Sequence, residues 1–248
     1  MLTVVTDMAV TEQVNQLAEK TLATFGQVDA VVNNAGYGQM GPLELLPTAA
    51  CQNQLAVNVL APLTLVQRLI PAMRDRGYGR IVNISSIAGR TAFPFGGIYS
   101  ASKFALEAIS DALRMELEPF NIQVSVIEPG PVSTPFFEVA ATGVEQAIAQ
   151  PETTPYRAAF ANLASLEART KMNAWTSEQV AEVILQALSV KSPKPRYVAA
   201  TGGKFLLALL TKILPTRAVD RFWQKFYGID RIAADWSTQF PAKKSNSL

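Results

Sequence analysis

The chain has 248 residues, 49% of them hydrophobic, so it is long enough to bury a sizeable core in one domain. A net charge of +2 argues against a dedicated nucleic-acid binder. The absence of histidine excludes Ser-His-Asp and Cys-His mechanisms and the usual zinc ligand sets, so no metal site is expected.

A single cysteine, Cys51, excludes an intramolecular disulfide. It lies in a helix-like stretch with no nearby base, which favours a buried structural thiol over a reactive one. No apolar run approaches the ~20 residues that a membrane-spanning helix needs, and no signal-peptide pattern follows Met1. We therefore expect a cytoplasmic protein.

The chain begins with a β-prone run at residues 2–5, which predicts a short strand leading to Asp7. Apolar residues then recur at helical spacing from about Thr11, and Gly26 is expected to end this helix. Because Asp7 stands just ahead of the helix, its carboxylate is a candidate N-cap.

A second strand is predicted at residues 29–32, and it leads into Asn33-Asn-Ala-Gly36. A glycine here suits a backbone that approaches a ligand closely, since it has no β-carbon; an ordinary strand-to-loop turn is the alternative. Residues 49–74 then predict a long apolar helix with Asn58 in its middle. A mid-helix asparagine competes for its own backbone, which indicates that Asn58 has a function.

The strongest signal for chemistry comes next. The apolar run at residues 81–84 predicts a strand buried on both faces, and Ser86 follows its carboxyl end. Tyr99 opens a long helical pattern, and Lys103 shares its helix face four residues later. An ammonium beside a phenol lowers the tyrosine pKa, which would make Tyr99 an acid/base near neutral pH.

Aromatic residues surround this centre. Phe93 and Phe95 lie between Ser86 and Tyr99, and Phe136 follows the next predicted strand, at residues 123–127. They suggest an apolar substrate pocket, although core packing is the alternative explanation.

Five motifs together resemble the short-chain dehydrogenase/reductase family of nicotinamide-dependent oxidoreductases. Ser86 precedes Tyr99 by 13 residues and follows Asn58 by 28, as in the family pattern. The other matching motifs are Tyr99 with Lys103, Asn33-Asn-Ala-Gly36, and Pro129-Gly-Pro-Val-Ser-Thr134. The resemblance runs from about Asp7 to Thr134, and it implies a Rossmann-like parallel sheet with helices on both faces.

The resemblance also implies a mechanism and its residues. Tyr99 would exchange a proton with the substrate oxygen, Lys103 would lower the Tyr99 pKa and bind the nicotinamide ribose, and Asn58 would hold a proton-relay water. Ser86 would orient the substrate oxygen, with Phe93, Phe95 and Phe136 around the substrate. The residues expected to border NAD or NADP are Asp7 (at the adenine ring), Asn33, Ala35, Gly36, Tyr99, Lys103, Pro129, Gly130, Val132 and Thr134.

The C-terminal part adds a helix from about Thr176, with Ser177 as a plausible cap, and a last strand at residues 196–199. A strongly apolar helix after Gly203 ends at Pro215. A basic stripe then recurs with aromatic residues between its members: Arg217, Arg221 and Lys225. This stripe either rests on a membrane surface or belongs to a helical pair that closes the substrate pocket or caps the sheet, and we favour the pair.

Members of the family begin with a strand and a glycine-rich turn that hold the pyrophosphate, and no such turn occurs in this chain. The resemblance therefore predicts an N-terminally truncated fold that lacks the first two strand-helix units, and it leaves the strand at residues 29–32 with an exposed apolar edge. We expect a partial catalytic domain at 1–200 with a substrate lid at about 131–175, a helical extension at 201–240 and a disordered tail at 241–248.

Two functions are consistent with this interpretation. The first is an NAD(P)-dependent oxidoreductase that interconverts an alcohol and a ketone or aldehyde, on a steroid-, retinoid- or lipid-like substrate, as a homodimer or homotetramer. The second is a cofactor-deficient fragment without catalytic activity that at most associates with related proteins. Contact of the C-terminal helices with a membrane is a further expectation.

Overall fold

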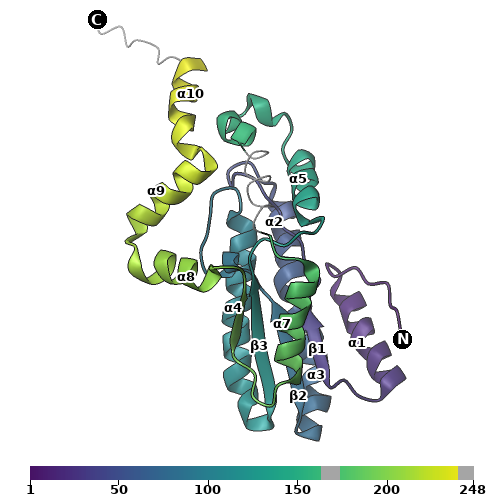
Figure 1. Ribbon diagram of the computed structural model, residues 1–248. Helices are drawn as coiled ribbons and strands as arrows, with labels where there is room; N and C mark the ends of the chain where they lie inside the picture. Colours follow the sequence, from purple (N-terminus) through teal and green to yellow (C-terminus); the bar gives the residue numbers. More distant parts are fainter. Residues whose placement is uncertain (163–173, 240–248) are drawn as a thin grey trace, which may run out of the picture.

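The computed structural model, which describes residues 1–162 and 174–239, is built on a four-stranded parallel sheet (Figure 1). The strands lie in sequence order, each paired in parallel with the next: β1 (Ala30–Asn33), β2 (Gly79–Ile84), β3 (Ile122–Pro129) and β4 (Arg196–Ala199). All four correspond to strands predicted from apolar runs. The parallel sheet, with helices on both faces, confirms the predicted Rossmann-like α/β class.

The described helices connect and extend this sheet. They are α1 (Thr11–Phe25), α2 (Thr48–Leu55), α3 (Ala61–Arg76), α4 (Gly97–Leu117), α5 (Phe136–Ala147), α7 (Ser177–Ser189), α8 (Gly203–Ala208), α9 (Thr216–Tyr227) and α10 (Ile232–Gln239). Two π-helical segments, Ala56–Leu60 and Leu209–Ile213, continue α2 and α8, and short 3₁₀ turns lie at Ile87–Gly89, Glu118–Phe120, Pro151–Thr153 and Ile229–Arg231. The expected helix boundary at Gly26 is confirmed, because this residue adopts a left-handed φ of 74° and its N–H bonds the Leu22 carbonyl.

Helices α1, α3 and α4 cover one face of the sheet. Their apolar side chains form one core cluster with alternate residues of β2 and β3: Ala18, Val66, Leu69, Met73, Ile81, Leu113, Leu117, Ile122 and Val124. Because side chains alternate along a strand, Ile81 faces this layer while its neighbour Val82 faces the other. The apolar runs that predict the strands are thus explained by burial on both faces.

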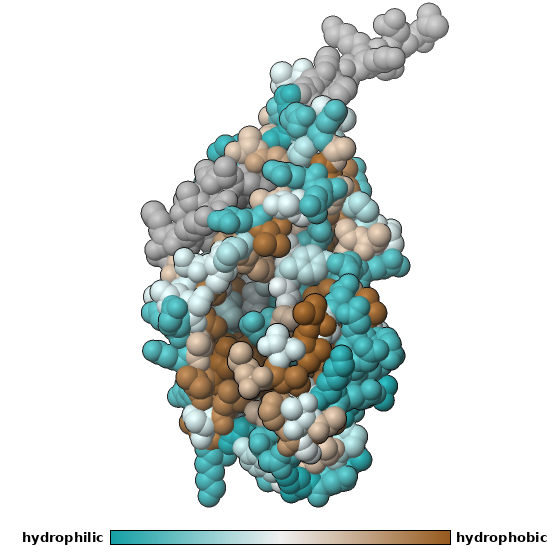
Figure 2. Space-filling view, turned by 90° about the vertical axis from the view of Figure 1, so that its right-hand side faces the viewer, coloured by the Kyte–Doolittle hydropathy of each residue, from teal (hydrophilic) through white to brown (hydrophobic). Residues whose placement is uncertain are grey.

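On the opposite face α7 packs against β2, β3 and β4. The cluster there contains Val82, Ile127, Val180 and Tyr197. β1 lies at the edge of the sheet, and Val32 is 37% exposed. Figure 2, which views the molecule from the side of α1 and β1, shows apolar surface gathered over the middle and lower part of this side. The predicted exposed apolar edge is confirmed.

Residues 48–76 form one continuous helix of 29 residues through α2, the π segment and α3. By length and composition alone this helix is long and apolar enough to cross a membrane, although its sequence contains no uninterrupted apolar run of that length. In the fold it is a packed helix: α3 contacts α1 and β2, the π segment contacts α4, and the polar side chains of Gln54 and Asn58 are buried.

The N-terminal predictions are corrected in two ways. Residues 1–7 form no strand, because the four strands pair only with one another and leave none to satisfy the backbone of residues 2–5. Val10, not Asp7, is the N-cap of α1. A turn, in which the Val10 N–H bonds the Asp7 carbonyl, separates Asp7 from the first residue of α1. The Asp7 carboxylate therefore accepts from the Ala9 N–H and not from an N–H of the helix.

Two smaller corrections concern α7 and Cys51. Thr176, rather than Ser177, caps α7, because its side chain bonds the Gln179 N–H while the Gln179 side chain bonds back to the Thr176 N–H. Cys51 is half-buried rather than buried, packed against the cluster of Leu46, Val144 and Ile148. The expected tail at 241–248 and part of the expected lid, residues 163–173, lie outside the described residues.

Candidate active site

Tyr99 lies in the first turn of α4 and is only 8% exposed. Its ring packs against Phe136, from the first turn of α5, with the ring centroids 5.5 Å apart. Ser86, which follows the carboxyl end of β2, lies near enough to the phenol to act on its pKa. Tyr99 and Ser86 therefore meet at the carboxyl edge of the sheet, the place where open α/β sheets bind ligands.

Ser86 is held in place by its neighbours. It caps the 3₁₀ turn Ile87–Gly89, where its Oγ accepts the Ala88 N–H at 3.1 Å. Its hydroxyl also donates to the Pro129 carbonyl oxygen, at 3.4 Å. Ser86 is thus tied to the end of β3 as well as to β2, which fixes its hydroxyl beside Tyr99.

Lys103 lies one turn after Tyr99 on α4 and is buried. Its Nζ donates to the Ile84 carbonyl at 2.9 Å and lies 5.8 Å from the centroid of the Tyr99 ring. Burial lowers the pKa of the Lys103 ammonium to about 8, and the charge of Glu107, one turn further along α4, opposes this change. An ammonium has three donors, so one bond to Ile84 leaves two N–H groups for a ligand.

The predicted direction of the Tyr99 pKa shift is wrong. Burial raises the pKa of the phenol above its usual value, and the nearby Ser86 side chain opposes this shift. Desolvation penalises the charged phenolate, and the Lys103 ammonium, with its own pKa lowered, does not outweigh that penalty. The Tyr99 phenol is therefore protonated at neutral pH in this structure.

Asn58 lies in the π-helical segment Ala56–Leu60 and is 1% exposed. Its Nδ2 donates to the Tyr37 carbonyl at 2.9 Å and to Ser102 Oγ at 3.1 Å, and its Oδ1 accepts the Tyr37 N–H at 3.2 Å. Asn58 therefore joins the loop after β1 to α4. Oδ1 accepts only one of these bonds, so its second acceptor position remains for a water.

Sequence reasoning missed the partner of Asn58 one turn earlier. Gln54 is fully buried; its Nε2 donates to the Tyr37 carbonyl at 2.9 Å and its Oε1 accepts the Gln39 N–H. Two amide side chains four residues apart thus hold the loop at residues 37–39 from the same helix face. The sequence does contain a signal for it: Gln54 is a second amide side chain within an apolar helix, four residues before Asn58.

Gly36 lies directly at the centre. A β-carbon at this position would lie 3.0 Å from Asn58 Oδ1 and 3.7 Å from Lys103 Nζ, so the backbone passes close to both side chains, and its close approach to a ligand stays a prediction. Ala35 beside it is exposed. Asn33, by contrast, turns inward: its Nδ2 donates to Asn83 Oδ1 at 2.7 Å, which ties β1 to β2. The Asn33 side chain therefore has a structural role in the sheet, and its role toward a cofactor stays a prediction.

The turn after β3 borders the same edge. The Gly130 N–H bonds the Ala199 carbonyl, and a β-carbon on Gly130 would clash with Ala200 at 2.7 Å, so glycine is required there. Val132 forms an isolated bridge with Trp175, and Thr134 precedes α5, where its Oγ1 lies 3.4 Å from the Phe136 N–H. This turn links Pro129, which contacts Ser86, to Phe136, which contacts Tyr99.

Phe93 and Phe95 belong to a different aromatic cluster. Phe93 stacks on Tyr227 of α9 and packs near Trp223, while Phe95 contacts Tyr156, Phe160 and Tyr227. Phe95 has a left-handed φ of 63°, a strained conformation for a bulky residue, which this packing holds in place. Among the described ring contacts only Phe136 reaches Tyr99, so the placement of Phe93 and Phe95 around the substrate stays a prediction.

The described residues fit one half of a dinucleotide. Two N–H groups of Lys103, beside the open backbone at Gly36, are suited to the hydroxyls of a ribose next to Tyr99. They do not fit the pyrophosphate half, because the first glycine in the sequence is Gly26, at the end of α1, and no glycine-rich turn lies between a strand and a helix ahead of β1. Asp7, expected at the adenine, is exposed.

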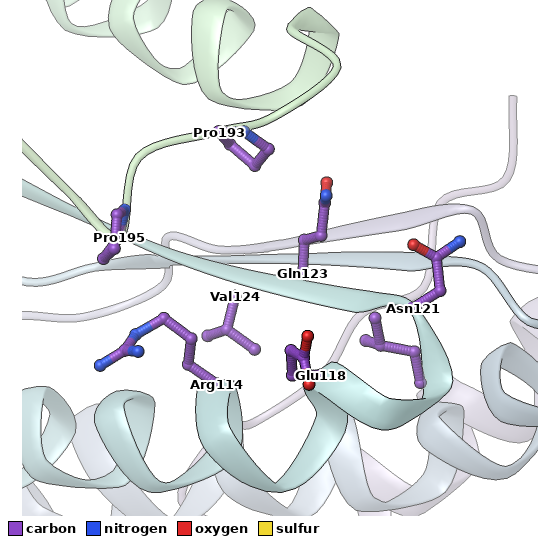
Figure 3. Close-up of a pocket in the computed structure, with 8 residues that line it drawn as sticks. Arg114, Glu118, Asn121, Gln123, Val124, Pro193 and Pro195 are labelled. Atoms are coloured by element: carbon purple, nitrogen blue, oxygen red, sulfur yellow. The ribbon is translucent and has the colours of Figure 1, made fainter.

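Two cavities lie outside this cluster. A cleft of about 630 Å³ lies between α2 and α5 and is lined by Tyr37, Gln39, Asn53 and residues of α5, so it borders the loop that Asn58 holds. The other, of about 190 Å³, is lined by Gln123 and Val124 near the start of β3 and by Arg114 near the end of α4 (Figure 3). It lies at the amino end of β3, away from Ser86 and Tyr99.

Comparisons with known proteins identify similar chains. The family model described as short chain dehydrogenase matches residues 1–145. A probable short-chain type dehydrogenase/reductase of Helicobacter pylori is 37% identical over 79% of this chain and 70% of its own, and human 17-beta-hydroxysteroid dehydrogenase type 1 is 36% identical over 79% of this chain and 59% of its own. The crystal structure of an NAD⁺-bound xylitol dehydrogenase matches with a TM-score of 0.63 and 25% identity, over 79% of this chain and 77% of that one.

Proposed function

The chain belongs to the short-chain dehydrogenase family, and we propose that its site interconverts an alcohol and a ketone or aldehyde with NAD or NADP. The observation that carries this proposal is the buried cluster of Tyr99, Ser86 and Lys103 at the carboxyl edge of the sheet, closed by Asn58 behind Gly36. The NAD⁺ bound by the xylitol dehydrogenase supports the choice of cofactor.

In this proposal Tyr99 transfers the proton and Ser86 orients the substrate. When bound, the nicotinamide supplies or accepts the hydride. Tyr99 Oη gives its proton to the carbonyl oxygen during reduction, a role that suits the protonated phenol at neutral pH, and takes it back during oxidation. Ser86 Oγ orients that oxygen by a second hydrogen bond.

Lys103 serves two purposes in this proposal. Its free N–H groups hold the ribose, and its positive charge stabilises the phenolate once Tyr99 has lost its proton. Asn58 keeps the loop with Gly36 open to the cofactor, and the remaining acceptor position of Oδ1 holds a water that returns protons from solvent.

We also propose an apolar, bulky substrate. Phe136 lies against Tyr99, and Phe93 and Phe95 belong to a second cluster of rings that includes Tyr227. The hydroxysteroid named for the human relative is a molecule of this kind. In this proposal residues 131–175 act as the substrate lid, within a catalytic domain at 1–200 that the extension at 201–240 follows. Self-association and contact of the C-terminal helices with a membrane stay predictions.

A turnover assay tests the proposal. The chain, extended at its N-terminus by the glycine-rich segment of a family member, is incubated with NADH or NADPH and a panel of ketones and aldehydes, and cofactor oxidation is followed by absorbance. Turnover that requires both cofactor and carbonyl supports the enzyme. Cofactor binding without turnover on any substrate would favour the alternative, a catalytically inactive fragment that associates with related proteins.

A further inference from the structure

The C-terminal helices carry a repeated pair of a cation and an exposed apolar side chain. Phe205, Ile213 and Phe222 are 71%, 67% and 43% exposed, and they are the large apolar side chains most exposed between Gly203 and Tyr227. Each directly follows a cation, in the pairs Lys204–Phe205, Lys212–Ile213 and Arg221–Phe222. We call the surface formed by these three pairs, together with Arg217 and Lys225, the basic-apolar face.

This face has a strong charge bias. Residues 203–227 contain five cations and one acid, Asp220, a net charge of +4, whereas the whole chain carries +2, so the rest of the chain is net negative. None of the five cations takes part in an ion pair with another described residue. Their charges are therefore free to act on something outside the molecule.

The fold holds this face outward. On α9 the neighbouring residues Trp223 and Tyr227 pack against Phe93, which turns Phe222 and Arg221 away from the body. On the preceding helix Leu207 and Leu210 are buried. The wider π turn at Leu209–Ile213 brings Ile213 closer to the same helix side as Phe205 than an α-helix would. In Figure 1, α8 and α9 stand out from the sheet on the side away from α1.

We propose that the basic-apolar face docks on the surface of an anionic lipid membrane. Helices that lie in a membrane interface combine exposed aromatic and aliphatic side chains with Lys and Arg. The apolar side chains enter the boundary of the acyl chains, and the Lys and Arg side chains contact the anionic headgroups. Charge argues against a second copy of the chain, since a two-fold contact would set +4 against +4. An acidic protein groove would meet the cations, but three separate large apolar side chains suit a fluid surface better than a single cleft.

Vesicle sedimentation with the full 248-residue chain tests this proposal. We expect binding to vesicles of phosphatidylcholine with phosphatidylglycerol, weak binding to phosphatidylcholine alone, and loss of binding at high salt. Each surface cation contributes roughly a fivefold change in partition coefficient, so Lys204→Gln with Lys212→Gln should lower binding by about 25-fold. Phe205→Ser with Ile213→Ser should lower it by at least tenfold through lost apolar burial.

Matched controls lie elsewhere on the surface. Lys20→Gln on α1 removes an exposed cation and Leu185→Ser on α7 removes a side chain that is 62% exposed, and neither should change binding. Circular dichroism confirms that each variant is folded. Equal binding to both vesicle types, equal loss in the control variants, or no binding to anionic vesicles would overturn the proposal. Size-exclusion chromatography that shows a dimer lost on Phe205→Ser would assign the face to a second copy instead.

Discussion

The Nζ of Lys103 lies 5.8 Å from the centre of the Tyr99 ring and makes its hydrogen bond with the Ile84 carbonyl, at 2.9 Å. Burial acts on both groups, but in opposite directions: the pKa of the phenol is raised, and the pKa of the ammonium is lowered to about 8. Both shifts favour the neutral form of the side chain. A ligand that brings polar groups to this pair would therefore change the protonation of both.

The first prediction follows from the Lys103 pKa. The pKa of lysine is about 10.5 in the unfolded chain and about 8 in the folded one, so the unfolded state binds more protons between these values. The stabilising contribution of a neutral Lys103 is present above pH 10.5 and is lost as pH falls through 8. Relative to Lys103→Met, the wild type should gain roughly 2 to 3 kcal/mol of unfolding free energy between about pH 8 and 10.

Urea denaturation at a series of pH values measures this difference. Comparison with Lys103→Met removes the effects of titrating groups that both proteins share and that do not interact with Lys103. Lys20→Met, an exposed cation on α1, serves as the control and should show no such trend. A parallel pH dependence of wild type and Lys103→Met would contradict the buried ammonium.

A second prediction concerns Asn58 as the anchor of the loop after β1. Asn58→Ala removes three hydrogen bonds and leaves the Tyr37 N–H and carbonyl without this partner, so it should lower the unfolding free energy by about 2–4 kcal/mol. The matched control is Asn53→Ala on the same helix, an exposed residue that makes one bond to the Tyr37 hydroxyl, and it should cost less than about 1 kcal/mol. If urea denaturation shows that both variants lose the same unfolding free energy, Asn58 is not the anchor of this loop.

The sequence predicts the proximity of Ser86, Tyr99 and Lys103 because they belong to regular elements. Ser86 follows a buried strand and Tyr99 and Lys103 share one helix turn, so the order of apolar runs alone brings them to one edge. The direction of the Tyr99 pKa shift was not predictable, because it depends on how far Phe136 and its neighbours exclude water. Similarly, the missing strand at residues 2–5 depends on whether a partner strand is present, which local propensity does not report.

A third prediction concerns substrate choice in the extended chain. If Phe136 lines the pocket beside Tyr99, kcat/KM should rise with the apolar bulk of the alcohol, since each buried methylene contributes ~0.8 kcal/mol. A bulky cyclic or long-chain alcohol should exceed a two- or three-carbon one by well over tenfold. Phe136→Ala should reduce that ratio, while Leu185→Ala, at a position 62% exposed on α7, should leave it unchanged. A preference for small polar alcohols would refute the apolar pocket.

The fourth prediction concerns the cofactor. The 248-residue chain should bind NAD and NADP very weakly, because Lys103 and Gly36 offer a ribose site but no described backbone cradle holds the pyrophosphate. Isothermal titration of both cofactors into this chain, beside the extended one, measures the difference. Micromolar affinity for the unextended chain would show that it contains a phosphate site of another kind.

The most direct test of the catalytic assignment is the turnover of Tyr99→Phe in the extended chain, on the best alcohol of the panel and with the preferred cofactor. Loss of the phenolic proton should lower kcat by ~10²–10⁴-fold, as expected when a general acid/base is removed, with cofactor affinity and unfolding free energy little changed. Tyr78→Phe, at a position 40% exposed, is the control and should keep wild-type turnover. Turnover of Tyr99→Phe close to that of the wild type would contradict Tyr99 as the acid/base.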